Sequence, residues 1–128
     1  GGCTDTWVNI RPGALRGSRP WAVSARTLDD TKLYMATLES NPRGSRYAAE
    51  APDGTPGYTW TSKYGFVGVT WAADSPGVYD DGLNERGLSV AQNQLDETVY
   101  PNVTDPSRAV DMRSVVAWLL GSAANVSE

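Results

Sequence analysis

Cys3, the only cysteine of the chain, is the residue best suited to carry out chemistry, and two glycines precede it. The sequence contains no histidine, which excludes a serine–histidine or cysteine–histidine pair within this chain. Removal of Gly1 and Gly2 would free the α-amino group of Cys3. With a reference pKa of about 8, that amine has a useful neutral fraction near pH 7. One terminal residue could then supply a thiol nucleophile and its base. The alternative is a small apolar residue in a frayed terminus, with glycines left by expression.

Arg26 and Asp29 are a cation and an anion that could assist this thiol. On a strand, residues 26 and 28 face one way and residues 27 and 29 the other, although Asp29 at the strand end can turn inward. A guanidinium beside the thiol would lower the thiol pKa, and a carboxylate would accept a hydrogen bond from the α-ammonium group and orient it. An ordinary exposed ion pair at a strand end is the alternative.

Composition excludes several classes of protein. The chain has 128 residues, 40% of them hydrophobic, as expected of one globular domain. A net charge of −4 and a pI near 4.7 argue against nucleic acid or an anionic membrane as partner. No apolar run approaches the roughly 20 residues of a membrane span. One cysteine excludes an internal disulfide and a cysteine-rich zinc site, and we expect no cofactor or metal. The compartment stays open, with periplasm or secretion as the expectation.

The pattern of the chain predicts a strand-rich α+β fold. Residues 39–57, rich in proline, glycine, serine and arginine, are predicted to form a loop. One hairpin is predicted to join 58–62 to 66–71, and another to cross 81–87, where the turn at Asn84 ends in Gly87 with a positive φ. The predicted strands, with Cys3 at or just before the first, are 5–10, 21–28, 32–38, 58–62, 66–71, 77–80 and 88–92.

After residue 108 the pattern becomes helical. Val110, Val115, Trp118 and Leu119 fall near one helical face, and Gly121 is a plausible end of that helix. Residues 125–128, Asn-Val-Ser-Glu, have the form of a capping box, which marks the start of another helix. We therefore expect residues 1–128 to be the N-terminal portion of a single, longer domain, truncated or cut into subunits. The expected architecture is a sheet with helices packed on one face.

Three segments together resemble the choloylglycine hydrolase family, which includes penicillin V acylases and conjugated bile salt hydrolases. They are Cys3-Thr4 with the Arg26–Asp29 segment, the Asp-Gly-Leu-Asn-Glu-Arg-Gly-Leu run at 81–88, and the Trp-Thr-Ser-Lys-Tyr-Gly run at 60–65. The last is similar to the branch found in Gram-negative bacteria. The segments occur in the family's order at comparable spacing, although the chain matches only about the first third of a typical member. Asp30 stands where the family often has tryptophan.

This resemblance implies an N-terminal-nucleophile (Ntn) amidohydrolase with an αββα fold, two stacked antiparallel sheets between helical layers. It assigns the nucleophile to Cys3, and the pair around the thiol and amine to Arg26 and Asp29. The backbone N–H aligning with Gln94 would donate to the tetrahedral oxyanion. The family completes this site with an asparagine and a second arginine, both expected beyond residue 128.

The resemblance also implies a small-molecule substrate, an amide with a bulky acyl group such as phenoxyacetyl, a bile acid or the fatty acyl chain of a homoserine lactone. The expected assembly is a homo-oligomer, with the possibility of a second chain that supplies the rest of the domain. Trp21, Trp60 and Trp71 could line the acyl pocket, or could pack in the sheet core. The alternative function is a non-catalytic, β-rich domain that binds a hydrophobic ligand.

Overall fold

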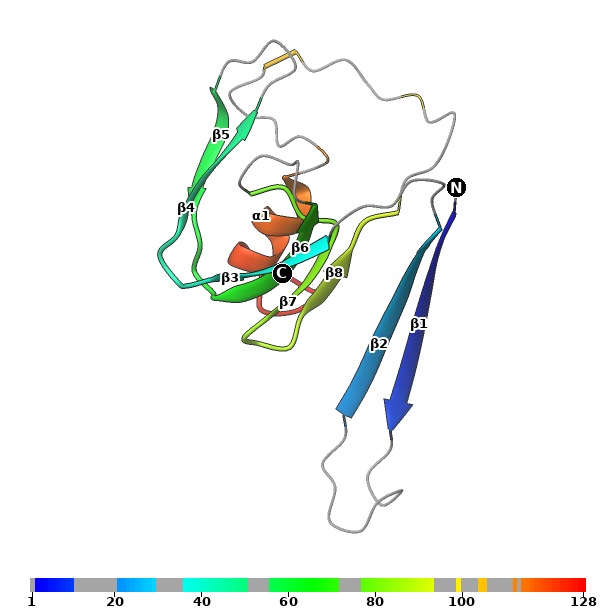
Figure 1. Cartoon of the computed structure of the whole chain (residues 1–128). Helices are drawn as coiled ribbons and strands as arrows, with labels where there is room; N and C mark the ends of the chain where they lie inside the picture. Colours follow the sequence, from blue (N-terminus) through cyan, green and yellow to red (C-terminus); the bar gives the residue numbers. More distant parts are fainter. Residues whose placement is uncertain are drawn as a thin grey trace. The chain divides into compact units, whose positions relative to one another are not determined.

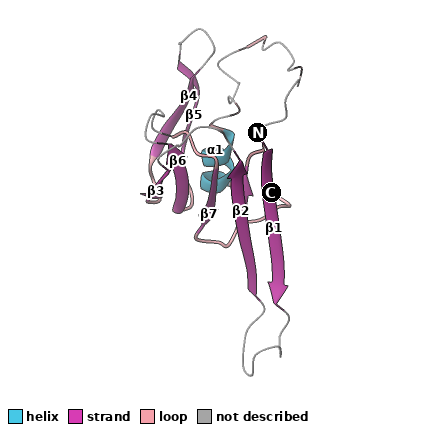
Figure 2. Cartoon of the chain, turned by 45° about the vertical axis from the view of Figure 1, so that its right-hand side comes forward, coloured by secondary structure: helices cyan, strands magenta, loops and turns pink. Residues whose placement is uncertain are grey.

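The computed structural model of the chain describes residues 2–10, 21–29, 36–50, 56–71, 77–93, 99, 104–105, 112 and 114–128. These residues form eight strands and one helix, and every strand pair among them is antiparallel (Figures 1 and 2). The chain divides into two compact units, Gly1–Leu33 and Tyr34–Glu128. The predicted strand-rich mixture of antiparallel sheets with helix is therefore confirmed.

The first unit contains an antiparallel ribbon of β1 (Gly2–Ile10) and β2 (Trp21–Asp29) (Figure 1). Its two strands pair without a bulge from one end to the other. β-branched and aromatic residues in both segments favour the extended conformation. The two strands predicted here are confirmed, but β1 starts at Gly2, so that Cys3 lies inside the ribbon.

The second unit is built on a four-stranded sheet of order β3-β6-β7-β8. Its strands are β3 (Ala36–Asn41), β6 (Phe66–Trp71), β7 (Asp81–Asn84) and β8 (Ser89–Ala91). Along β6, Phe66, Gly68 and Thr70 are buried, whereas Val67 between them is exposed. This alternation shows that one face of the sheet carries the core. Of the predicted strand 32–38, residues 36–38 lie in β3, which extends farther, to Asn41. Residues 32–35 lie outside the described part.

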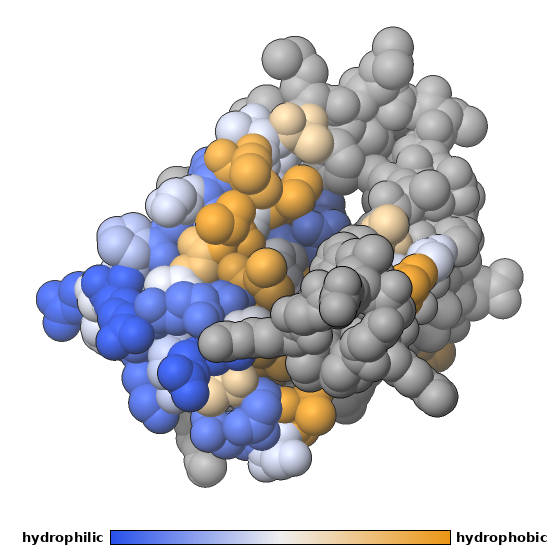
Figure 3. Space-filling model, turned by 90° about the horizontal axis from the view of Figure 1, so that it is seen from below, coloured by the Kyte–Doolittle hydropathy of each residue, from blue (hydrophilic) through white to orange (hydrophobic). Residues whose placement is uncertain are grey.

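The opposite face of this sheet presents apolar side chains to solvent. Leu38, Val67 and Leu83 are 70%, 37% and 54% exposed. Val67 pairs with Leu83, and Leu38 pairs with Val69 across β3 and β6, so these side chains share one face. Apolar residues also gather between hydrophilic ones on the described surface seen in Figure 3. Within the second unit, the sheet therefore has one face covered by core residues and one apolar face that no described element of this unit covers.

The predicted loop over 39–57 and the predicted hairpin between 58–62 and 66–71 are both wrong. A further strand, β4 (Arg46–Glu50), lies in that loop region and pairs with β5 (Pro56–Thr61), whereas β6 pairs with β3 and β7. The pairing of Tyr47 with Trp60 explains why β5 pairs with β4 and not with β6, because it puts two large rings on the same face of the β4–β5 ribbon.

The second predicted hairpin is confirmed, with its first arm displaced. β7 starts at Asp81, and the strand predicted over 77–80 is not formed; β8 pairs with β7 in register. The turn between them is tight, because the N–H of Gly87 donates to the carbonyl oxygen of Asn84 at 2.9 Å. Gly87 has φ +86°, as the sequence predicts for glycine at the end of this turn.

Helix α1 (Val115–Ser122) packs against β6, β7 and β8. Of the residues predicted to share one helical face, Trp118 is half-buried and packs against the core. The buried residues of the helix are Val116, Ala117, Leu120 and Gly121. At Gly121 the helix lies close to Ser62, the residue after β5. A Cβ atom added at Gly121 would lie 3.0 Å from the Cβ of Ser62, so a larger residue has little room at this position. Val115 and Leu119 are half-buried as well, and Val110 lies outside the described part.

The predicted helix end at Gly121 is one residue early, since α1 ends at Ser122. The predicted capping box at 125–128 forms a turn: the Oδ1 of Asn125 accepts from the N–H of Ser127 at 2.9 Å. The carboxylate of Glu128 accepts from the N–H of Ala124, also at 2.9 Å.

One hydrophobic core joins the β4–β5 ribbon, the four-stranded sheet and α1. Its buried members are Ala49, Trp60, Phe66, Tyr79, Val116, Ala117 and Leu120. Within the described ranges, no helix is both long enough and apolar enough to cross a membrane.

Candidate active site

The β1–β2 ribbon brings the backbone positions of the predicted nucleophile, cation and anion to one end of two paired strands. Cys3 is the Cα partner of Leu28, Gly2 that of Asp29, and Asp5 that of Arg26. Directly opposed Cα atoms in such a pair lie about 4.5–5.5 Å apart. The backbone of Cys3 is therefore one residue pair from Asp29 and two from Arg26. The side chains of these residues lie outside the described part, so their chemical roles stay predictions.

The register also distinguishes the two charged positions. Because opposed residues share a face and alternate residues switch faces, position 26 lies on the same face as position 3, and position 29 on the other. Asp29 is instead the partner of Gly2, whose peptide bond contains the nitrogen of Cys3. Position 26 is thus on the same face as position 3, and position 29 is paired with the residue whose removal would free the amine.

The other predicted site residues are farther from Cys3 or not described. Trp21 pairs with Ile10 at the opposite end of the ribbon, seven residue pairs from Cys3, or about 23 Å at roughly 3.3 Å per residue. Contact between Trp21 and an acyl group on Cys3 would need an acyl chain of that reach. Trp71 ends β6 and pairs with Ala36, and its side chain lies outside the described part, as does Gln94.

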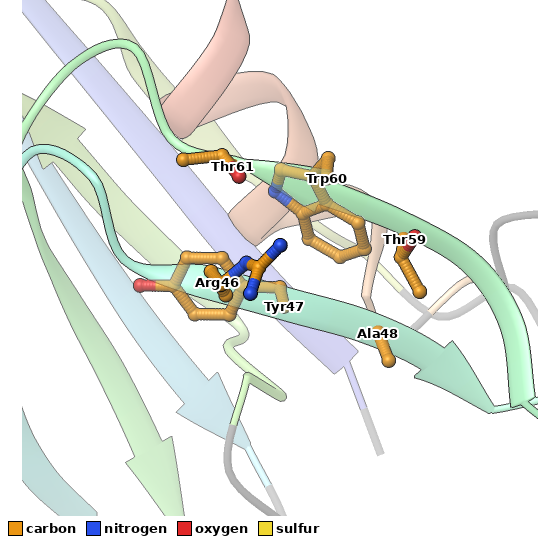
Figure 4. Close-up of a pocket in the computed structure, with 6 residues that line it drawn as sticks. All are labelled: Arg46, Tyr47, Ala48, Thr59, Trp60 and Thr61. Atoms are coloured by element: carbon orange, nitrogen blue, oxygen red, sulfur yellow. The ribbon is translucent and has the colours of Figure 1, made fainter.

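Trp60 is a core residue that also forms one wall of a shallow concavity. Its side chain is 9% exposed and stacks on Tyr47, with ring centroids 5.3 Å apart. Tyr58 also stacks on Trp60, with ring centroids 6.2 Å apart. The concavity has a volume of about 490 Å³, and the described residues that line it come from β4 and β5 (Figure 4). A role of Trp60 in binding substrate stays a prediction, whereas its packing in the core is observed.

A buried tyrosine connects this aromatic stack to the edge of the sheet. The hydroxyl of Tyr79 lies 3.0 Å from the Oε2 of Glu39 and 3.0 Å from the Oδ1 of Asn41, which also accepts from Tyr47 at 2.6 Å. Burial raises the pKa of the Tyr79 phenol well above its usual range. Tyr79 is therefore a protonated donor, and this network holds β3, β4 and the segment before β7 together.

The two segments that resemble family motifs, 60–65 and 81–88, meet at the C-terminal end of α1. The carbonyl oxygen of Gly121 accepts from the backbone N–H groups of Lys63 and Tyr64, at 2.7 and 3.1 Å. From the other segment, the Nδ2 of Asn84 donates to the carbonyl oxygens of Leu120 and Ala123, at 3.0 and 2.7 Å. Both segments thus satisfy helix-end carbonyls that have no partner within the helix.

Asn84 is 3% exposed, and every hydrogen-bonding capacity of its amide is used. Besides the two bonds from Nδ2 to α1, its Oδ1 accepts from the backbone N–H groups of Arg86 and Leu88, both at 3.0 Å. The side chain therefore closes the β7–β8 turn and joins that turn to the helix. This explains on physical grounds why an asparagine stands at this position of the hairpin.

Glu85 ties the same two segments together at the surface. Its Oε1 accepts from the backbone N–H of Gly65 at 2.9 Å and from the Nε of Arg43 at 2.5 Å. The hydrogen bond from Arg43, then that from Gly65, lower the pKa of the Glu85 carboxyl below its usual value. Glu85 and Arg43 are exposed, so this ion pair orders the loops more than it stabilises the fold.

Comparison with protein families decides the identity. The family model of linear amide C–N hydrolases, choloylglycine hydrolase family, matches residues 18–128. The chain belongs to the choloylglycine hydrolase family. It is therefore an enzyme, a hydrolase of linear amide C–N bonds, and a non-catalytic binding domain is not favoured. A search of curated proteins found no match.

The range that matches the choloylglycine hydrolase family includes Arg26, Asp29 and both motif segments. Cys3 precedes this range, so its assignment as nucleophile depends on the sequence argument and on its place in the ribbon. Sequence reasoning identified the 81–88 hairpin but missed the contact of Asn84 with α1. A signal was present: an asparagine at the start of a predicted hairpin turn, followed later in the chain by a predicted helix whose end needs hydrogen-bond donors.

Proposed function

We propose that this member of the choloylglycine hydrolase family is an N-terminal-cysteine amidohydrolase. It cleaves a linear amide that bears a bulky acyl group, through an acyl-thioester on Cys3. The observation that supports this assignment is the register of the ribbon, in which Cys3 is the partner of Leu28 and Gly2 that of Asp29. That register gives the thiol position a cation on its own face and gives the terminal nitrogen an anion alongside.

Formation of the acyl-enzyme follows from this arrangement. Removal of Gly1 and Gly2, which we propose to be autocatalytic, frees the α-amine of Cys3, and the neutral amine takes the thiol proton. The thiolate attacks the amide carbon, and the carbonyl electrons move to oxygen, where the backbone N–H at residue 94 donates to the oxyanion. Collapse of this intermediate breaks the C–N bond, and the α-ammonium group gives its proton to the leaving amine.

Release of the acyl group uses the same residue as base. The neutral amine of Cys3 takes a proton from water, and the hydroxide attacks the thioester carbon. The second tetrahedral intermediate breaks its C–S bond, which yields the carboxylic acid and restores the thiol. Arg26 lowers the thiol pKa, and Asp29 orients the amine between these steps. No histidine is needed, in agreement with the composition.

We further propose that the described sheet is one layer of an αββα sandwich. Its core face is covered by α1, and its opposite face exposes Leu38, Val67 and Leu83. Stacked sheets pack about 10 Å apart through apolar inner faces, and this face has the composition that such packing requires. The remaining strands of the domain would cover it.

The test is hydrolysis by the native protein of three amides: penicillin V, a glycine-conjugated bile acid and a long-chain N-acyl homoserine lactone. We expect turnover of at least one, and loss of kcat/KM by at least about 10³-fold on Cys3→Ala, since the nucleophile is removed. Cys3→Ser is the matched control, because it keeps the geometry with a hydroxyl of much higher pKa. We expect it to be nearly as inactive. Turnover that persists in Cys3→Ala would overturn the proposal.

A further inference from the structure

Asn84 is a buried side chain that ties the β7–β8 hairpin to the end of α1, in addition to the pairing of β7 with β6. Two of its four hydrogen bonds close the turn, and two reach the last carbonyl oxygens of α1. A backbone N–H donor for an oxyanion has to be placed to within a fraction of an ångström, and a misplacement of about 1 Å can cost roughly 10²-fold in rate. A side chain that fixes the position of the hairpin therefore also affects the position of any backbone N–H donor on the same strand.

Backbone hydrogen bonds between β7 and β8 connect Asn84 to the rest of β8. Asn84 donates its backbone N–H to the carbonyl oxygen of Leu88 at 2.9 Å, at the turn end of the hairpin. The strands then pair in register as far as Asp81 with Ala91. The N–H of Gln92 extends the ladder by donating to the carbonyl oxygen of Asp80 at 2.8 Å. The ordered pairing thus reaches two residues short of position 94 in the sequence.

We infer that Asn84 is a positioning residue of the amidase reaction: its anchoring of the β7–β8 hairpin to the end of α1 fixes the strand that leads to the oxyanion donor at residue 94. This inference rests on the proposed function. Asn84 itself touches no reacting atom. Its amide acts through the backbone, because only a group with two donors and a double acceptor can join the turn to both helix carbonyls at once.

Two variants of the native protein separate the two sets of hydrogen bonds that the Asn84 side chain makes, those within the turn and those to α1. Asn84→Ala removes all four bonds, whereas Asn84→Asp keeps the acceptor for the turn and loses both donors to the helix. Asn125→Ala is the matched control, since Asn125 is exposed and its side chain accepts from the N–H of Ser127 within a surface turn. Each variant is assayed for kcat, for KM and for the rate at which iodoacetamide alkylates Cys3.

We expect kcat to fall roughly 10- to 100-fold in both Asn84 variants, with KM changed less than about threefold. The alkylation rate should stay within about twofold of wild type, since alkylation of a thiolate forms no oxyanion. Asn125→Ala should leave all three quantities unchanged. A merely structural role would instead lower kcat and the alkylation rate together, in proportion to the folded fraction, and this outcome overturns the inference, as does an unchanged kcat.

If Asn84→Ala does not fold, kcat, KM and the alkylation rate are measured on Asn84→Asp and Asn84→Ser instead. If none of the three variants folds, Asn84 has no role in catalysis that can be separated from its role in stability, and the inference is overturned. The proposed function fails on a different result, namely turnover in wild-type protein that does not depend on Cys3. When turnover depends on Cys3 and the Asn84 variants match wild type, the inference about Asn84 fails alone.

Discussion

The two units of the chain differ in what their residues do. The ribbon of the first unit carries the predicted nucleophile with its cation and anion, and its described side chains, Thr6, Val8 and Ala25, are exposed. The second unit carries a buried core and polar side chains whose hydrogen bonds tie loops and strands to a helix. A two-stranded ribbon is at best marginally stable by itself. The predicted nucleophile and its charged neighbours thus belong to one unit, and the described buried core belongs to the other.

This difference predicts that stability and thiol reactivity can be changed independently. Substitutions in the core of Tyr34–Glu128 should lower the free energy of unfolding and leave the intrinsic reactivity of Cys3 in the folded protein unchanged. Three substitutions, at Gly82, Tyr79 and Arg43, follow in order of decreasing expected effect, and Gly87→Ala is the control for the first.

Gly82→Ala should have the largest effect on stability. A Cβ atom added there would lie 2.5 Å from the Cδ1 of Leu120 and 2.5 Å from the backbone carbonyl oxygen of Val67, which cannot move aside. We expect the free energy of unfolding to fall by about 2–3 kcal/mol, measured by urea denaturation. The rate of Cys3 alkylation in the folded protein should not change.

Gly87→Ala is the matched control for that variant. A Cβ atom at Gly87 meets no atom within 4 Å, so its only cost is the positive φ of +86°. We expect about 1 kcal/mol of destabilisation. Equal losses at positions 82 and 87 would contradict the close packing of β7 against α1.

Tyr79→Phe should have an intermediate effect. It removes the hydroxyl that lies 3.0 Å from both Glu39 and Asn41 while keeping the buried ring, and we expect a loss of about 1 kcal/mol. Because burial raises the pKa of Tyr79 when folded, the unfolded chain loses this proton first, from about pH 10 upward. The stability contribution is thus present below that pH and declines as the pH rises.

Urea denaturation at pH 8 and at pH 10.5 measures this slope. Wild-type protein should lose stability between the two values, and Tyr79→Phe should lose less. The same slope in both proteins would show that another group causes the alkaline loss, and that the phenol of Tyr79 is not held in its neutral form.

Glu85 should show the smallest effect, visible in its titration more than in stability. Its folded pKa is lowered by the hydrogen bond from Arg43 and then by that from Gly65. Its contribution to stability is therefore present above the unfolded pKa and is lost as the pH falls through the folded pKa. In an NMR titration we expect the carboxyl midpoint below that of a model glutamate, with Arg43→Ala raising it. A midpoint that is identical in Arg43→Ala would exclude the ion pair as the cause.

The sequence predicted elements defined by local patterns more reliably than it predicted their partners. Alternation and β-propensity located β1 and β2, and the glycine at position 87 marked its turn. The hairpin between 58–62 and 66–71 was wrong because adjacency in sequence does not choose a pairing partner. Tyr47, in a segment rich in turn residues, packs on Trp60 across β4 and β5, and that contact depends on the core as a whole.

The candidate site shows the same limit. Cys3, Arg26 and Asp29 were chosen for their chemistry and their family resemblance, and the ribbon pairs their backbones at one end. The pattern placed Val115, Trp118 and Leu119 near one face of α1, whereas the buried residues include the small Ala117 and Gly121. Gly121 lies close to Ser62, a contact that only the packed structure shows. Asn84 was seen as a turn residue, and its bonds to the helix follow only from three-dimensional packing.

The most direct test of the account is the mass and reactivity of the N-terminus in the active protein. Intact-mass analysis before and after limiting iodoacetamide distinguishes molecules that retain Gly1 and Gly2 from molecules that begin at Cys3. We predict that the processed form is the one that turns over amide, that its thiol is alkylated faster near neutral pH, and that alkylation abolishes its turnover. Equal turnover by molecules that retain both glycines would contradict the account, because the base proposed here would then be an amide nitrogen.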